Sequence, residues 1–108
     1  MRTLKEIIHT HTMWGPAENR IGFLTLGLCG EVGELANLVK KDWRGDEGDR
    51  RRKIEDEIAD AGAYLLMICD LLGLDLEELI KRKAEEVEQR PQWQEYLKQR
   101  DSSNVQDG

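Results

Sequence analysis

Apolar residues recur along the chain at the three- and four-residue intervals of amphipathic helices, and the alternation typical of strands is nearly absent. Four segments follow the helical pattern: residues 2–13, 17–42, 49–72 and 75–89. Gly15-Pro16, Gly73 and Pro91 break the pattern between or after these segments. The sequence therefore predicts an all-α fold, an antiparallel bundle of about four helices.

Local signals define where some of these helices begin and where the domain ends. Asp49 is a candidate N-cap for the third helix, and Asp75 with Glu78 three residues later resembles a capping box. Beyond Pro91, Trp93 and Tyr96 fit a short final turn, and the polar end reads as a loose tail. We predict one domain over residues 1–98 and a flexible C-terminal tail over residues 99–108.

Two acidic pairs stand inside the apolar stripes of the second and third segments. Glu31 and Glu34 lie in GEVGEL, and Glu57 and Asp60 lie in EDEIAD. A spacing of three residues turns both carboxylates of a pair to the same side of a helix. The core-facing stripe of the second segment contains Ile21, Leu24, Leu28, Glu31, Leu35 and Leu38. That of the third contains Lys53, Glu57, Asp60, Tyr64, Met67 and Leu71.

Carboxylates on a burying face are unfavourable unless something pairs them. If the two helices pack together, four carboxylates surround one point, and their repulsion calls for cations. Ligation by oxygen alone suits Mg²⁺, Mn²⁺ or Ca²⁺. The alternative is that both pairs lie on solvated helix faces, which are common in a chain with 35% charged residues.

Glycines surround the first acidic pair inside a predicted helix. Gly27, Gly30 and Gly33 lie in the second segment and Gly62 lies in the third. Each costs about 1 kcal/mol relative to alanine in a helix interior. Close approach of a ligand and tight helix packing explain these glycines equally well.

Composition excludes some classes of binding partner and cellular location. The net charge of −6 argues against a nucleic acid polymer, although a bound metal would still allow a small phosphorylated ligand. The longest purely apolar run is far shorter than a membrane span, and the N-terminus has no apolar signal core, so we expect a cytoplasmic protein without a membrane partner. Cys29 and Cys69 lie among apolar residues, which favours two reduced core thiols over a disulfide or a zinc site.

The ordered motifs resemble the MazG-like nucleotide pyrophosphohydrolases of the all-α NTP pyrophosphatase superfamily. The match consists of LGLCGEVGELANL, a loop, EDEIADAGAYLLMI and then KRKAEEVEQR, over about residues 20–90. The family signature is ExxE followed by ExxD on the next long helix. Two positions depart from it: Glu85 stands where an asparagine often follows the family lysine, and Gly30 stands where many members have another acid. Both departures concern substrate contacts rather than the metal set.

The resemblance implies a reaction, in which a nucleoside triphosphate, (d)NTP, is cleaved between its α and β phosphates to (d)NMP and pyrophosphate. It implies that Glu31, Glu34, Glu57 and Asp60 hold Mg²⁺, with Mn²⁺ as a possible substitute. One of these acids is expected to act also as the base for the attacking water, and we choose Glu34, although the sequence does not separate the two roles. The expected phosphate-binding residues are Lys53, Lys83 and Arg90. Trp14 is a candidate for stacking the base, with a position in the core as the alternative. For Lys53, an ion pair with Glu57 one turn later is the simpler interpretation, and Arg90 is also compatible with a solvated helix end.

Two other classes of function remain open. Di-iron bundles need two carboxylate-xx-His motifs, and this chain has only Glu6 with His9. A non-catalytic helical module, binding nucleotides or a protein partner, would leave the acidic pairs facing solvent. The family is usually oligomeric, and so small a bundle with long apolar helices fits a homodimer or homotetramer whose sites are completed by neighbouring chains.

Overall fold

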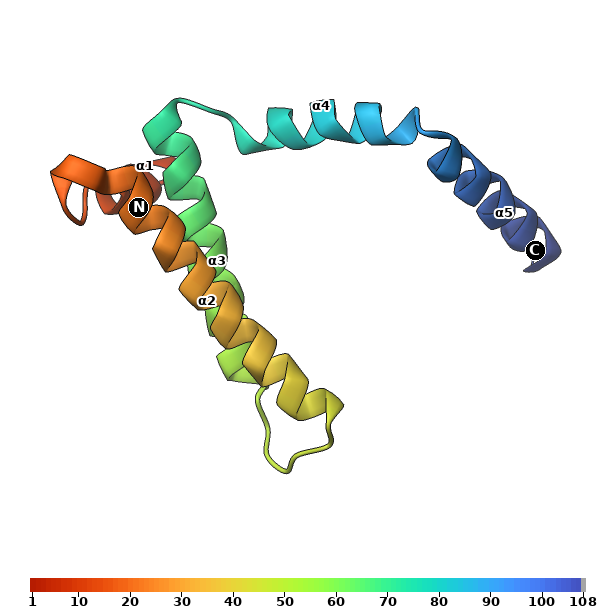
Figure 1. The fold of residues 1–108 in the computed structure, drawn as a ribbon, viewed down its shortest axis with the longest axis horizontal. Coiled ribbons are helices and arrows are strands. Elements are labelled where there is room, and N and C mark those ends of the chain that lie inside the picture. Colours follow the sequence, from red (N-terminus) through yellow and green to blue (C-terminus); the bar gives the residue numbers. More distant parts are fainter. Residues whose placement is uncertain (108) are drawn as a thin grey trace. The chain divides into compact units, whose positions relative to one another are not determined.

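The computed structural model describes the backbone of residues 1–107 and the side chains of residues 1–102. This part of the chain contains α-helices and one short 3₁₀ turn, and no strand (Figure 1). The elements are α1 (Leu4–Thr12), η1 (Ala17–Asn19), α2 (Arg20–Trp43), α3 (Arg51–Leu72), α4 (Leu76–Glu88) and α5 (Pro91–Asp107). The predicted all-α class is confirmed.

Contacts divide the chain into two compact units, Met1–Leu74 and Asp75–Gly108. In the first unit, α2 and α3 run antiparallel along each other, and α1 packs against α3 (Figure 1). In the second unit, α4 contacts α5. The single domain predicted for residues 1–98 stays a prediction, as does the assembly of four helices into one bundle.

The core of the first unit is small. Ile8, Leu24 and Met67 are buried and pack together, one from each of α1, α2 and α3. Leu24 belongs to the predicted core-facing stripe of α2, whose first member, Ile21, is exposed. Because Leu24 packs with Met67 of α3, this part of the stripe faces α3, and the buried centre lies at the α1 end of the helix pair.

The loop between α2 and α3 is held by Arg50. Its guanidinium donates to the carboxylate of Asp42 (2.9 Å) and to the backbone carbonyls of Asp46 (3.1 Å) and Glu47 (2.7 Å). Arg50 is also the N-cap of α3, so the prediction of Asp49 at this position was wrong. The Asp49 carboxylate, one residue before the N-cap, instead accepts from the N–H of Arg51 (3.0 Å). It thus satisfies one of the free N–H groups at the start of α3.

Other helix boundaries follow the sequence signals closely. Asp75 is the N-cap of α4 and accepts from the N–H of Glu78 (3.2 Å). Gly73 ends α3 in the left-handed conformation, with φ of 69°. The C-terminal end differs from the prediction, because α5 continues to Asp107 where we expected a short turn and a loose tail. Gly108 lies outside the described residues.

The glycines have different roles. A β-carbon on Gly27 would collide with the ring of Tyr64, so this position permits close packing of α2 on α3. Gly30, Gly33 and Gly62 have open space beside them in this chain. Helix packing therefore accounts for Gly27 alone.

Helix α2 is unusually apolar for its exposure. By length and composition, Ala17–Trp43 could cross a membrane, although core helices of water-soluble proteins meet the same criteria, and only 6% of the apolar window is buried in this chain. Both cysteines are free, but Cys29 is exposed and only Cys69 is buried. The prediction of a core position was therefore wrong for Cys29, because it lies on the side of α2 turned away from α3.

Candidate active site

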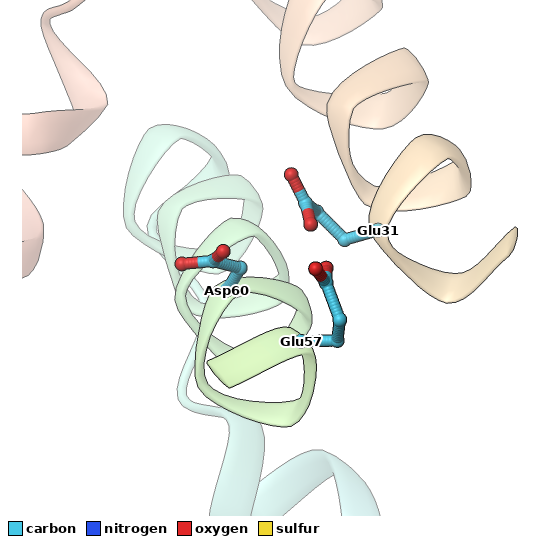
Figure 2. Close-up of side chains that lie close together, drawn as sticks. All are labelled: Glu31, Glu57 and Asp60. Carbon is cyan, nitrogen blue, oxygen red and sulfur yellow. The ribbon is translucent and has the colours of Figure 1, made fainter. Parts of the chain in front are cut away.

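Three of the predicted acidic residues converge between α2 and α3. Glu31 on α2 and Glu57 and Asp60 on α3 each offer a carboxylate oxygen, and these oxygens all lie within 4.8 Å of one another. Figure 2 shows Glu31 and Glu57 extending toward each other between the two helices, with Asp60 beside them on α3. Glu31 and Glu57 are half-buried and Asp60 is exposed. The spacing of the acidic pairs thus places carboxylates from both helices at one point.

Glu57 stands at the centre of this acidic group. Its pKa is raised from 4.5 to about 7, first by a hydrogen bond with Glu31, then by burial and by the Glu34 carboxyl. When both acids are ionised, no proton is available for that hydrogen bond. The buried Oε2 of Glu57 has no hydrogen-bond partner among the described residues. A buried carboxylate oxygen without a donor is the kind of group that a cation satisfies.

Glu34 and Lys53 lie on the loop side of these acids, in a cavity of about 270 Å³. Glu34 faces Glu57 but is not one of the three residues whose oxygens lie within 4.8 Å of one another. Lys53 forms no ion pair within 4.0 Å in the described part of the chain. The simpler interpretation of Lys53, an ion pair with Glu57, was therefore wrong, since the side chain lines the cavity without meeting that carboxylate.

Trp14 lines a second cavity, of about 160 Å³, at the opposite side of the acids. Its side chain is 76% exposed, so it is not a core residue. The other lining residues are His11, Phe23, Leu24, Tyr64 and Met67. Tyr64 lies one turn after Asp60 on α3, which connects this aromatic cavity to the acidic group.

Lys83 and Arg90 belong to the second unit. Lys83 pairs with Glu86 (3.3 Å) on the surface of α4 and borders an apolar cavity that contains Trp93. Arg90 is exposed between α4 and α5, and its backbone carbonyl accepts from the N–H groups of Trp93 (3.0 Å) and Gln94 (3.1 Å). Their roles toward a phosphate stay predictions.

The single carboxylate-xx-His motif is used inside the fold. Glu6 and Thr3 form the capping box of α1, and His9 Nδ1 lies 3.0 Å from an Asp70 carboxylate oxygen on α3. Neither residue belongs to a group of converging metal ligands in the described residues. These contacts give the motif a structural role and no support to a di-iron site.

Several residues that border the site had no distinct signal in the sequence. Asn37 lines the cavity that holds Lys53, and His11, Phe23 and Tyr64 surround the aromatic cavity. Tyr64 was visible only as a member of the core-facing stripe. The spacing from Glu34 to Asn37, again three residues, was the one pattern that placed Asn37 beside the acids.

Comparison with known proteins identifies the class to which this helical acidic site belongs. The model of the MazG nucleotide pyrophosphohydrolase domain matches residues 22–94, which include all four predicted acids. The chain therefore belongs to the MazG family, as the sequence motifs predicted, and this is a family of hydrolases acting on nucleotide phosphoanhydrides.

One curated relative is a phage protein. The gene 37 protein of Mycobacterium phage L5 is 30% identical over 74 residues, which cover 65% of each chain. The match thus spans less than two thirds of that relative's length. No solved structure matches the chain.

Proposed function

We propose that this protein is a metal-dependent nucleoside triphosphate pyrophosphohydrolase, which cleaves (d)NTP between the α and β phosphates to (d)NMP and pyrophosphate. The observation that carries this proposal is the convergence of Glu31, Glu57 and Asp60 within the region that matches the family. In a non-catalytic module the acids would face solvent. Two of them are instead half-buried and face each other across α2 and α3, which supports the hydrolase.

The residues fit a hard divalent cation, and we propose Mg²⁺, with Mn²⁺ as a substitute. All ligands in the group are carboxylate oxygens, and the buried Oε2 of Glu57 has no hydrogen-bond partner in the described part of the chain. Glu31, Glu57 and Asp60 would hold the ion, and Glu34 is close enough to Glu57 to join them. When bound, such an ion neutralises phosphate charge and lowers the pKa of a coordinated water.

The chain's own residues then provide the proton transfer. We propose that Glu34 is the general base, because its exposed carboxylate borders both the acidic group and the adjoining cavity. Glu34 takes a proton from water while the water oxygen forms a bond to the α phosphorus. The bond from that phosphorus to the α–β bridging oxygen breaks, and the bridging oxygen leaves with the pyrophosphate.

The aromatic cavity is proposed to hold the nucleobase. Trp14 is exposed at its border, and Phe23 and Tyr64 provide further ring surfaces. Aromatic faces stack on any base, and the ring nitrogens of His11 offer a hydrogen-bond partner for its edge. Lys83 and Arg90, which belong to the second unit, are proposed to bind phosphate oxygens.

That assembly is proposed to be a cytoplasmic homodimer or homotetramer. The support is the amount of apolar surface that α2 and α3 leave exposed, including Val32, Val39, Ile58 and Leu72. Glu31 and Glu34 lie in the middle of α2, so a membrane-spanning α2 would place two carboxylates inside the bilayer. A second copy of the chain can cover the apolar surface of α2 without this cost.

A nucleotide panel tests the proposed function. The purified protein is incubated with canonical and modified NTPs and dNTPs in Mg²⁺, and the products are separated by chromatography. We expect monophosphate and pyrophosphate with Mg²⁺ or Mn²⁺, and no product in excess EDTA. Full activity in EDTA would contradict the metal-dependent mechanism, and orthophosphate as the first product would contradict the position of cleavage.

A further inference from the structure

Helices α2 and α3 place their site residues in matching order along the helix pair. From the α1 end toward the 44–50 loop, α3 presents Tyr64, Asp60, Glu57 and then Lys53. Because α2 runs in the opposite direction, the order on its facing side is Gly27, Glu31, Glu34 and then Asn37. Gly27 is packed on Tyr64, Glu31 lies beside Asp60 and Glu57, and Glu34 faces Glu57. Asn37 and Lys53 border one cavity.

This order gives the site two different ends. Toward α1, the acids are followed by the aromatic cavity around Tyr64. Toward the loop, they are followed by the polar cavity of about 270 Å³, whose lining residues are Glu34, Asn37, Leu38, Lys53, Asp56 and Glu57. A nucleotide with its base among the aromatic rings and its α phosphate at the acids would extend its remaining phosphates toward Asn37 and Lys53.

The side-chain N–H groups of Lys53 and Asn37 make no ion pair or hydrogen bond with other described residues. The neighbouring cations on α3 are paired one turn ahead, Arg51 with Glu55 and Arg52 with Asp56, whereas Lys53 has no ion pair in the described residues. The side-chain amide of Asn37 likewise makes no hydrogen bond to another described residue. An ammonium and an amide together offer five N–H donors, which suit the oxygens of a phosphate chain.

We propose that this cavity is the subsite for the two terminal phosphates and that Asn37 is the residue that distinguishes triphosphates from diphosphates. The proposal rests on the proposed function, since it assumes that the α phosphate lies at the acids. The lining also contains the carboxylates of Glu34, Asp56 and Glu57, so this proposal needs the cation bound at the acids before the phosphates enter. Lys53 is the one positive side chain of the lining, and the amide of Asn37 adds donors without a further negative charge. A diphosphate, which is one phosphate shorter, would leave these donors only partly used.

The test compares Asn37→Ala and Asn37→Asp with the wild-type protein and with Arg51→Ala, which removes a neighbouring cation that does not line the cavity. Three quantities are measured: inhibition by pyrophosphate, inhibition by nucleoside monophosphate, and the ratio of kcat/KM for NTP over NDP. We expect both Asn37 variants to bind pyrophosphate at least several-fold more weakly and to lose part of the triphosphate preference. Asn37→Asp should lose more, because a carboxylate repels phosphate. Monophosphate inhibition should not change, and Arg51→Ala should resemble the wild type.

Titration of pyrophosphate with Mg²⁺, followed by NMR of the side-chain amide groups, provides a readout that needs no turnover. The Asn37 signal is assigned by its loss in Asn37→Ala, and we expect it to shift with pyrophosphate. Equal weakening of pyrophosphate and monophosphate binding, or an Asn37 signal that pyrophosphate leaves in place, would overturn the proposal. A wild-type protein that turns over no nucleotide would contradict the proposed function instead, while a pyrophosphate-dependent shift at Asn37 would still support the subsite.

Discussion

Glu57 is the acid of the site whose pKa the neighbouring carboxylates raise. Glu31, burial and Glu34 together raise its pKa to about 7, so the metal-free site holds a proton over much of the acidic range. A cation needs the ionised carboxylate, and binding therefore releases this proton. We expect the affinity for Mg²⁺ or Mn²⁺ to rise as the pH increases through about 7.

The same shift predicts how stability depends on pH in the absence of metal. The folded pKa lies above the unfolded value of 4.5, so the contribution of Glu57 is fully present below pH 4.5 and is lost as the pH rises through about 7. In EDTA, the melting temperature of the wild type should therefore fall relative to that of Glu57→Gln between pH 5 and pH 8. Glu85→Gln, a change at an exposed acid on α4, is the control. A constant difference between wild type and Glu57→Gln would contradict the raised pKa.

Replacement of other acids separates catalysis from folding. Glu34→Ala or Asp60→Ala should abolish turnover, because each removes a carboxylate of the proposed site. The melting temperature without metal should stay the same or rise, since one of several like charges has been removed. Circular dichroism melts and product chromatography measure the two effects. A collapse of the melting temperature in Glu34→Ala would show instead that Glu34 stabilises the fold.

At the scale of elements, the contact between α2 and α3 positions every acid of the site. Substitutions of the glycines on α2 test how closely the two helices pack. Gly27→Ala places a methyl group against the Tyr64 ring and should destabilise the fold by about 1–3 kcal/mol. Gly30→Ala meets nothing within 4 Å and should stabilise α2 by about 1 kcal/mol. Denaturant unfolding of the two variants measures the difference. A destabilised Gly30→Ala would show that another chain packs against this position.

Much of this element structure could be predicted from the sequence, because helix periodicity and short-range signals determine it. Asp75 and Gly73 act on their own neighbours, so their roles were legible, and the same periodicity placed both acidic pairs on the facing sides of α2 and α3. Helix α5 was missed because it has few apolar positions and its second half is rich in polar residues that favour loops.

Other features depend on contacts between segments far apart in the sequence. The start of α3 was misplaced because Arg50 is fixed by carbonyl groups across the loop, a tertiary effect. The aromatic cavity joins residues of α1, α2 and α3, and no local pattern links Trp14 to Tyr64. Whether Lys53 pairs with Glu57 or lines a cavity is decided by side-chain conformation, which spacing alone does not determine.

At the scale of the whole molecule, the exposed apolar surface predicts self-association. Ile58 and Leu72 are each 55% exposed, and Leu65 between them completes a seven-residue spacing along one face of α3. We expect a dimer or tetramer by sedimentation equilibrium and a shift toward monomer in Ile58→Glu. Ala59→Glu, which adds the same charge on another face of α3, should leave the assembly intact. A monomeric wild type at micromolar concentration would contradict the proposed assembly.

The central claim is that the acids between α2 and α3 direct water to the α phosphorus of a nucleoside triphosphate. Hydrolysis of a substrate NTP in ¹⁸O-labelled water with Mg²⁺, followed by mass spectrometry of the products, tests it most directly. The account predicts one ¹⁸O atom in the monophosphate and none in the pyrophosphate, which is released intact. Label in the pyrophosphate, or release of orthophosphate with a nucleoside diphosphate, would contradict it.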